Sequence, residues 1–209
     1  MKLEALQNLK KEIEENKSLS LQEANLVFGE GSPDAEIIFI GEAPGYYEDL
    51  EKRPFVGRSG QLLTVLVKSI GIRRENVYIT NIVKRRPPEN RDPLPEEISL
   101  YSPYLIKQVE IIGPKIIATL GRFSMNFFLP FAKISRDQGK SFLWNEKIIM
   151  PLYHPAAALR STAVKKELEE SFIKLKAVLE NYSESLKKKP VVENVPEKKD
   201  GAKKQMGLF

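Results

Sequence analysis

Four short apolar runs divide the chain, and each is rich in isoleucine or valine: residues 36–41, 77–80, 115–121 and 147–153. They read as continuous apolar runs, which is typical of strands buried on both faces of a parallel sheet. The segments between them carry apolar residues at helical spacing. This alternation of strands and helices predicts an α/β fold, with three α/β/α layers around a mainly parallel four-stranded sheet.

The expected helices are marked by their ends as well as by their apolar stripes. Residues 60–71 carry one apolar stripe that stops at Gly71, and residues 95–113 begin with a proline and two acids and stop at Gly113. Further helices are expected at 2–16, 121–131 and 160–182.

The composition allows one sizeable core, since 42% of the 209 residues are apolar. From residue 184 onward, lysine, proline and acidic residues dominate and cannot build a core. We therefore expect one domain over 1–183, followed by a disordered lysine-rich tail over 184–209.

The formal net charge of +5 is concentrated in this tail. From Lys187 onward there are seven lysines and three acidic residues, so the preceding body carries only about +1. Net charge alone therefore does not indicate nucleic-acid binding. We expect no membrane span, because no apolar run approaches 18 to 20 residues, and we expect a cytoplasmic monomer.

The chain contains no cysteine and a single histidine, His154. The absence of cysteine excludes disulfides and thiolate ligands, and one histidine is too few for a typical zinc site. We therefore predict no metal site.

Polar residues follow the predicted strands directly: Glu42 after the first, Asn81 after the second and His154 after the fourth. Taken singly, each has a structural explanation as a solvated acid, a strand-terminating amide or a partner of a loop carbonyl. The carboxyl ends of parallel strands share one edge, however, and ligands bind in the crevice there. The three side chains are therefore expected to converge on one site.

Two loops near this edge are open to two interpretations. Phe55 is either tucked into the core or forms a pocket wall on which a base stacks. The basic loop 83–93 is either a solvated surface or a set of phosphate contacts, and the candidate contacts are Lys84, Arg85, Arg86 and Arg91, together with Arg160.

Four blocks together resemble the family 4 uracil-DNA glycosylases: "GEAPGYYEDLEKRPFVGRSGQLL", "YITNIVKRRPPENRDP", "PYLIKQVEIIGPKIIATLGR" and "YHPAAALR". The resemblance covers roughly residues 25–160 in order. It implies a three-layer fold and hydrolysis of the bond between uracil and deoxyribose, in a nucleotide flipped out of the DNA.

The resemblance also implies roles for single residues. Glu42, Ala43, Pro44 and Gly45 belong to the motif beside uracil and the attacking water, and Glu48 is its second acid. Phe55 is the ring under the flipped base, Asn81 reads the base edge, and His154 contacts the O2 side of the leaving base. An asparagine side chain can complement O4 and N3–H of uracil. A histidine donor and nearby carboxylates match the negative charge on the departing base and the positive charge on the sugar. The choice between Glu42 and Glu48 as the residue that handles the water stays open.

The chain departs from this family at its iron–sulfur cluster. Family 4 enzymes bind a [4Fe-4S] cluster through four cysteines, and the matching positions here are Arg85 and Tyr101, with Glu14 and Lys17 by ungapped counting. We therefore expect no cofactor. The chain is either a glycosylase without a cluster or a degenerate relative that binds DNA or a replication partner without catalysis. A nucleotide-binding enzyme is disfavoured, because "GEAPG" is not a dinucleotide or P-loop signature.

The last five residues, "QMGLF", place Gln205, Leu208 and Phe209 at the spacing of the peptides with which repair proteins bind the replication sliding clamp. The alternative is an unselected terminus. A short apolar anchor on a disordered tether would raise the local concentration of the protein on DNA.

Overall fold

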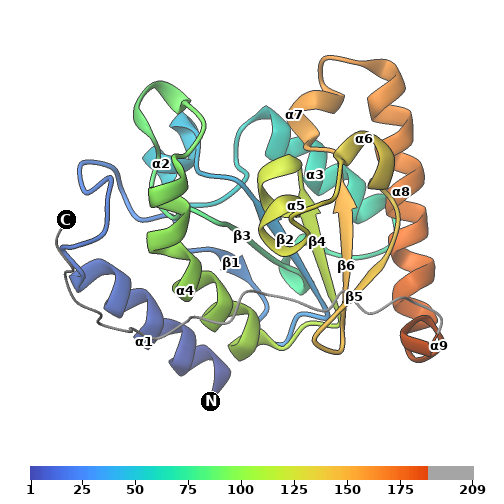
Figure 1. Cartoon of the computed structure of the whole chain (residues 1–209), viewed down its shortest axis with the longest axis horizontal. Coiled ribbons are helices and arrows are strands. Elements are labelled where there is room, and N and C mark those ends of the chain that lie inside the picture. The colour runs from blue at the N-terminus through green and yellow to red at the C-terminus, as the bar shows by residue number, and fades with distance from the viewer. Residues whose placement is uncertain (188–209) are drawn as a thin grey trace, which may run out of the picture.

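The computed structural model describes residues 1–187 and shows three layers, with helices on both faces of a central sheet (Figure 1). The strands are β1 (Glu30–Gly31), β2 (Ile37–Gly41), β3 (Tyr78–Asn81), β4 (Ile116–Leu120), β5 (Phe142–Trp144) and β6 (Lys147–Leu152). The α-helices are α1 (Lys2–Glu15), α2 (Tyr46–Glu51), α3 (Arg58–Ser69), α4 (Pro95–Ile112), α5 (Arg122–Phe128), α6 (Ile134–Asp137), α7 (Pro155–Ala158), α8 (Thr162–Glu180) and α9 (Tyr182–Lys187). Two short 3-10 helices lie at Arg74–Asn76 and Pro88–Asn90.

The sheet has the strand order β1-β3-β2-β4-β6-β5. The four predicted strands form its parallel centre, which confirms the predicted fold class. The prediction of four strands was too few, because β1 and β5 add an antiparallel strand at each edge. These edge strands have two and three residues, which is too short to produce a periodic apolar pattern.

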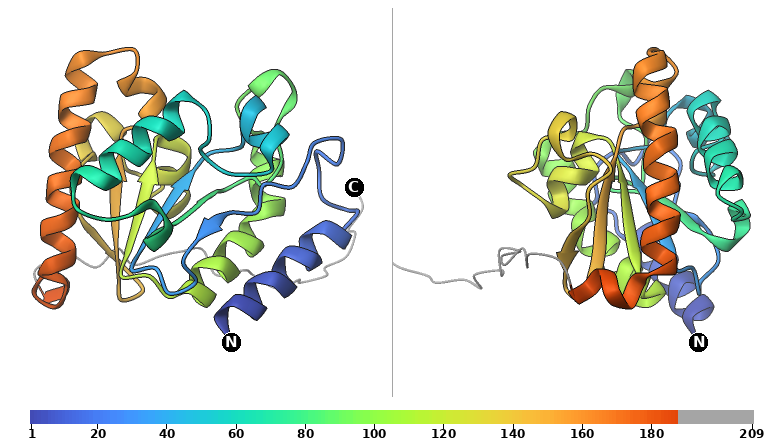
Figure 2. Two further views of the ribbon diagram at one scale, coloured as in Figure 1. Left: turned by 180° about the vertical axis from the view of Figure 1, so that it is seen from behind. Right: turned by 90° about the vertical axis from the view of Figure 1, so that its right-hand side faces the viewer.

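Alternate residues of the central strands pack into two separate cores. On β2, Ile38 and Ile40 face the core shared with α1, α4 and α5, whereas Ile37 and Phe39 face the core shared with α3 and α8. Figure 2 shows α3 and α5 on opposite sides of the sheet. Since both faces are covered, the central strands are buried throughout, as their apolar runs predicted.

The helix ends follow the sequence signals. The N–H of Leu94 donates to Glu97 Oε2 (2.8 Å) at the start of α4, and Gly113 ends this helix with a left-handed backbone conformation. At the other end of the chain, α9 runs past residue 183, where the tail was expected to begin. There Tyr182 donates its hydroxyl hydrogen to the Glu146 carbonyl (2.6 Å).

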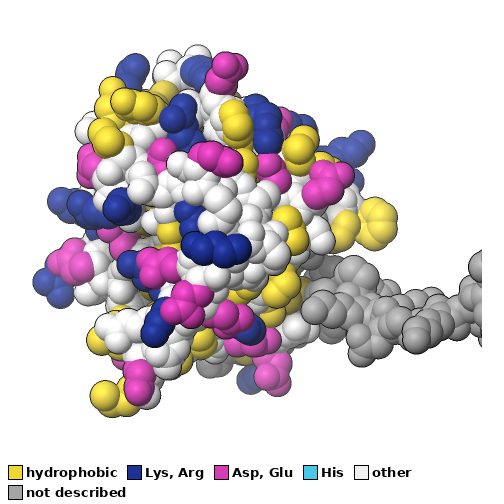
Figure 3. Space-filling model, turned by 90° about the vertical axis from the view of Figure 1, so that its left-hand side faces the viewer, with side chains coloured by type: hydrophobic (Ala, Val, Ile, Leu, Met, Phe, Trp, Pro, Cys, Tyr) yellow, Lys and Arg dark blue, Asp and Glu magenta, His cyan; other side chains and the backbone are white. Residues whose placement is uncertain are grey.

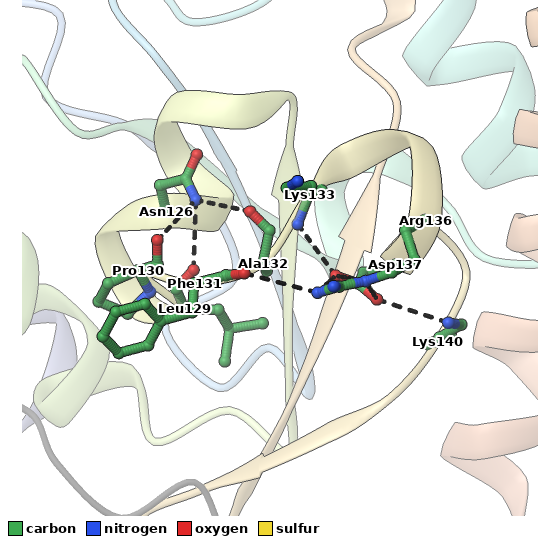
Figure 4. Close-up of polar contacts among 9 residues, drawn as sticks. All are labelled: Asn126, Leu129, Pro130, Phe131, Ala132, Lys133, Arg136, Asp137 and Lys140. Carbon is green, nitrogen blue, oxygen red and sulfur yellow. Dashed lines mark hydrogen bonds and ion pairs between the residues drawn. The ribbon is translucent and has the colours of Figure 1, made fainter.

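The loop between α5 and α6 is held by side chains of both helices (Figure 4). Asn126 Nδ2 donates to the carbonyls of Leu129, Pro130 and Ala132, and Asp137 accepts from the N–H of Lys133. Phe131, within this loop, is 94% exposed.

Charges of both signs are interspersed on the face shown in Figure 3. This mixture agrees with the nearly neutral body that the sequence indicates. Within residues 1–187, no helix is long and apolar enough to cross a membrane.

Candidate active site at the carboxyl edge of the sheet

A cavity of about 430 Å³ opens where the central parallel strands end. Its lining includes eight residues that the sequence singled out: Glu42, Ala43, Gly45, Glu48, Phe55, Asn81, His154 and Arg160. The predicted convergence of Glu42, Asn81 and His154 at one sheet edge is therefore confirmed. Pro44 is buried in the same turn and is not part of the lining.

Backbone pairing between β2 and β3 continues past both strands and brings Glu42 beside Asn81. The N–H of Ile82 donates to the Gly41 carbonyl, and that of Val83 donates to the Glu42 carbonyl, each at 3.1 Å. Gly41 has to be a glycine, because a Cβ there would overlap Asn81 Oδ1 and lie 2.7 Å from the Phe55 ring. The absence of a side chain at Gly41 thus leaves room for the side chains of Asn81 and Phe55 next to each other.

Phe55 forms one wall of the cavity and is also part of the core between the sheet and α3. Phe55 is therefore packed in the core and also lines the cavity, and the stacking of a base on its ring stays a prediction. Its φ is +52°, which is unusual for a bulky residue and costs roughly 1 to 3 kcal/mol. Arg74 Nη2 holds the preceding turn by donating to the Pro54 carbonyl (2.7 Å), and the ring centroid lies 5.6 Å from that of His154.

Asn81 ends β3 and is 2% exposed. Its side-chain amide has no hydrogen-bond partner among the described residues. A buried amide without a partner is costly. The amide therefore has one acceptor and two donor hydrogens free for a ligand in the cavity.

His154 lies at the start of α7 and lines the same cavity as the acidic turn after β2. Its Nδ1 accepts a hydrogen bond from the N–H of Ala156 (3.1 Å). Burial lowers the pKa of His154 to about 4, so the imidazole is neutral at pH 7. Since Nδ1 accepts, the single ring proton is on Nε2, which is free to donate.

The two acids of the turn after β2 have different surroundings. Burial, and to a lesser extent the negative charge of Asp92, raise the pKa of Glu42 to about 7, although Arg122 opposes this rise. Glu48 instead accepts a hydrogen bond through Oε1 from the N–H of Gly57 (3.1 Å). Glu42 is thus suited to exchange a proton near neutral pH, whereas Glu48 is fixed by the backbone.

Two of the five proposed phosphate contacts are contradicted by burial. Lys84 is 0% and Arg85 is 7% exposed, so neither reaches a surface on which DNA could lie. Lys84 points toward α4 and donates to Gln108, and Arg85 donates to the carbonyl of Ala24. A run of basic residues in sequence does not reveal which of its side chains fold inward.

The other three basic residues differ in whether their guanidinium groups already bind other side chains of the protein. Arg91 makes a two-point ion pair with Glu97 (2.9 and 2.6 Å), and Arg86 donates to Asn90 (2.6 Å). Arg160 is exposed and lines the cavity mouth. Of the five, Arg160 is therefore placed best for a phosphate contact.

The residues at the four cluster positions do not fit an iron–sulfur cluster. Arg85 and Tyr101 are not thiolates, Glu14 and Lys17 are exposed, and the whole chain has no cysteine. Within the described part of the chain, no group of three or more His, Asp or Glu side chains could hold a metal ion.

Arg85 and Tyr101 instead link three segments through hydrogen bonds. Tyr101 on α4 donates to the carbonyl of Ser20 (2.7 Å), and Arg85 donates to the carbonyl of Ala24. Burial raises the pKa of Tyr101 to about 12, so its hydroxyl stays protonated and remains a donor. These contacts tie the segment after α1 to α4 and to the basic loop.

Sequence reasoning missed several residues of this site. Ser59, Asn90, Asp92 and Ala156 also line the cavity, and Asp92 forms an ion pair with Arg122 (2.6 Å). Asp92 stands inside the basic loop 83–93. An acidic residue among arginines is a signal in the sequence, but the positive charge of the loop as a whole obscured it. Next to Arg160, Leu159 is 43% exposed.

This chain is similar to known proteins over most of its length. A family model described as the uracil DNA glycosylase superfamily matches residues 28–176. The type-4 uracil-DNA glycosylase of Sulfurisphaera tokodaii is 48% identical over 186 residues, which cover 83% of this chain and 84% of that protein. The type-4 enzyme of Archaeoglobus fulgidus is 45% identical and that of Saccharolobus solfataricus 50% identical, over 83% and 74% of this chain and 92% and 76% of theirs. The chain therefore belongs to the uracil-DNA glycosylase superfamily, among relatives of type 4.

Proposed function

We propose that this protein removes uracil from DNA by hydrolysing the N-glycosidic bond of a flipped-out nucleotide, without an iron–sulfur cluster. The observation that carries the proposal is that one cavity of about 430 Å³ is lined by an aromatic ring, an unpartnered amide, a neutral histidine and a carboxyl group of raised pKa. Its type-4 relatives, named as uracil-DNA glycosylases, support the same reaction.

The depth of the cavity supports base flipping. Asn81 is 2% and Phe55 is 6% exposed, so a base that remained stacked in a duplex could not reach either side chain. An enzyme that acts on such a base takes the nucleotide out of the stack, at a cost of a few kcal/mol. Leu159, exposed beside Arg160 at the mouth, can fill the gap that the base leaves.

Uracil recognition follows from the two walls of the cavity. The Phe55 ring stacks on the base, which is worth roughly 1 to 3 kcal/mol. The Asn81 amide complements O4 and N3–H of uracil at the same time. Cytosine presents an amino group at position 4 and an unprotonated N3, so it would face this amide with its donor and acceptor exchanged.

Cleavage of the N-glycosidic bond produces a negative charge on uracil and a positive charge on the sugar, and the proposed site has one group to stabilise each charge. When the N1–C1′ bond breaks, its electron pair leaves with uracil and spreads onto O2, toward which His154 Nε2–H donates. The sugar becomes cationic, and we place it beside the side chain of Glu48, which the N–H of Gly57 holds in position. These groups stabilise charges that develop only in the transition state.

We assign the water to Glu42. The oxygen of water forms the new bond to C1′, and its proton passes to the Glu42 carboxylate, while the departing uracil anion is later protonated on N1. A base is most effective when its pKa is near the working pH, as the pKa of about 7 for Glu42 is. Glu42→Gln should therefore lose more activity than Glu48→Gln.

The test is uracil release from an oligonucleotide that contains one uracil, detected as strand cleavage after alkali. Asn81→Ala should lose most of the activity, whereas Asn181→Ala, the same change at the exposed end of α8, should lose none. Phe55→Ala should weaken capture of the base, with Phe131→Ala as its exposed control. Unchanged single-turnover rates in both site variants would refute the site.

The proposed absence of a cluster has its own readout. The purified protein should be colourless, and its activity should survive chelators. A brown preparation whose activity is lost with the colour would contradict this part of the proposal. A protein that binds uracil-containing DNA but releases no uracil would instead support the alternative, a binding protein without catalysis.

The sliding clamp is proposed as a partner from the sequence alone. Gln205, Leu208 and Phe209 lie outside the described residues, so this proposal rests on their spacing and on the lysine-rich segment that precedes them.

A further inference from the structure

Lys84, which the sequence suggested as a phosphate contact, is fully buried between β3 and α4. Its Nζ donates three hydrogen bonds: to Asn81 O (2.6 Å), to Thr80 Oγ1 (2.7 Å) and to Gln108 Oε1 (2.5 Å). No carboxylate accepts from this Nζ within residues 1–187. A buried lysine without a carboxylate partner is costly, and the mechanism described above makes no use of it.

The three acceptors match an ammonium group. The Thr80 hydroxyl donates its own hydrogen to the Phe28 carbonyl (2.8 Å), so its oxygen can only accept from Lys84. The Gln108 amide also donates to the Phe28 carbonyl (3.0 Å), which turns its oxygen toward Lys84. A neutral amine has two N–H groups and would point its lone pair at the third oxygen. Burial lowers the pKa of Lys84 well below its usual range, and these three oxygens oppose that effect by solvating the charge.

Lys84 lies directly behind the residue that is proposed to read uracil. It binds the backbone carbonyl of Asn81, while the side chain of Asn81 faces the cavity on the Phe55 side of the sheet. Thr80, the neighbour of Asn81 in the strand, points the other way, toward Gln108. The two faces of β3 thus carry the buried cation and the base-reading amide.

We propose that Lys84 is a positioning residue for uracil removal: its ammonium fixes the end of β3 that carries Asn81 and places a positive charge behind the edge of the bound base. The inference rests on the proposed function. Uracil departs as an anion whose charge is shared by N1, O2 and O4. A buried cation is poorly screened by water or salt, so its attraction for that anion persists in the transition state.

The test separates this charge effect from simple structural support. Lys84→Met keeps the length of the side chain and removes the charge, and the matched control Thr80→Val removes one acceptor but keeps the ammonium. Single-turnover release is measured with excess enzyme on oligonucleotides that contain uracil or 5-fluorouracil. The electron-withdrawing fluorine stabilises the leaving anion, so 5-fluorouracil depends less on help from the enzyme.

We expect Lys84→Met to slow uracil release by roughly 10- to 100-fold, less than the loss of a donor that touches the substrate. The ratio of the wild-type rate to the Lys84→Met rate should be at least severalfold smaller for 5-fluorouracil than for uracil. Thr80→Val should slow the release of both bases by the same factor. Equal deficits of Lys84→Met on the two bases, in an active wild type, would overturn this inference alone. A wild type that releases no uracil would overturn the proposed function together with it.

A second measurement needs no variant and therefore does not depend on the folding of Lys84→Met. Nitrogen-15 NMR of lysine-labelled wild-type protein distinguishes an ammonium, with three attached protons, from an amine. We expect one slowly exchanging ammonium signal at pH 7, which belongs to the buried lysine. A neutral amine signal for Lys84 at this pH would overturn the proposal.

Discussion

The rate of uracil release should fall on the acid side of neutral pH as Glu42 becomes protonated. Asp92→Asn should shift this acid limb of the pH–rate profile to lower pH. Burial, together with the repulsion between the Glu42 and Asp92 carboxylates, raises the pKa of Glu42 to about 7. Asp92 also pairs with Arg122 (2.6 Å), whose charge opposes the rise. Removing the Asp92 charge ends the repulsion and frees Arg122, and both changes lower the pKa of Glu42.

The size of the shift follows from the position of Asp92. Its side chain is 63% exposed, so water and salt screen its charge. At an effective dielectric constant of roughly 20, a neighbouring charge screened in this way changes a pKa by about 0.5 to 1 unit. The Glu42 carboxyl group must be deprotonated to accept a proton from water, so the rate of uracil release rises as the pH passes through the pKa of Glu42. Asp92→Asn should therefore be about 2- to 5-fold faster than the wild type at pH 6, when each rate is expressed relative to its own value at pH 8.

The assay is single-turnover uracil release between pH 5 and 9, with enzyme in excess so that DNA affinity does not limit the rate. Asp34→Asn is the matched control, because Asp34 is exposed and lines a separate hollow away from the cavity. Glu42→Gln should abolish the limb itself. An acid limb that stays in place in Asp92→Asn, or shifts to higher pH, would refute the assignment of this limb to Glu42.

Three further changes test other parts of the structure. Tyr101→Phe removes the hydrogen bond to the Ser20 carbonyl and should lower the free energy of unfolding by about 1 kcal/mol, measured by denaturant titration; an unchanged midpoint would show that this link does not stabilise the fold. Arg160→Gln should flatten the dependence of log affinity on log salt by about one unit, whereas Arg73→Gln, at an exposed position away from the cavity, should leave the slope unchanged. Deleting residues 205–209 should leave release from a short oligonucleotide intact but abolish calorimetric binding to the sliding clamp; a tail peptide that does not bind at high micromolar clamp would leave only an unselected terminus.

The central fold could be predicted because its signals are local and strong. Each parallel strand is a continuous apolar run, and α4 is bounded by an acidic first turn and by Gly113. The meeting of Glu42, Asn81 and His154 followed from topology alone, since parallel strands end at one edge. Distance in sequence did not matter for this prediction.

The rest depends on contacts that a single sequence does not display. Lys84 and Arg85 stand in a basic run that looks solvated, yet their partners are Gln108 and the Ala24 carbonyl, far away in the chain. Charge pattern predicts the sum of charges in a loop but not the direction of each side chain. The sequence left the choice between Glu42 and Glu48 open for the same reason, because their surroundings depend on burial and on the N–H of Gly57.

The proposed loss of the cluster raises the question of what holds the basic loop in place. A cluster would join three segments through bonds to one centre, whereas here separate hydrogen bonds, each worth about 1 kcal/mol, join α4 and the basic loop to residues 20–27, just after the N-terminal cluster positions. Tyr101 reaches Ser20, Arg85 reaches Ala24, and the N–H of Val27 donates to the Lys84 carbonyl (2.8 Å). Asn25 extends the link to α2 by donating to Asp49, one residue after Glu48. Because the bonds lie along one continuous segment, 20–27, they reinforce one another, and removal of a side chain that binds this segment should disturb the acidic turn of the active site as well as the loop.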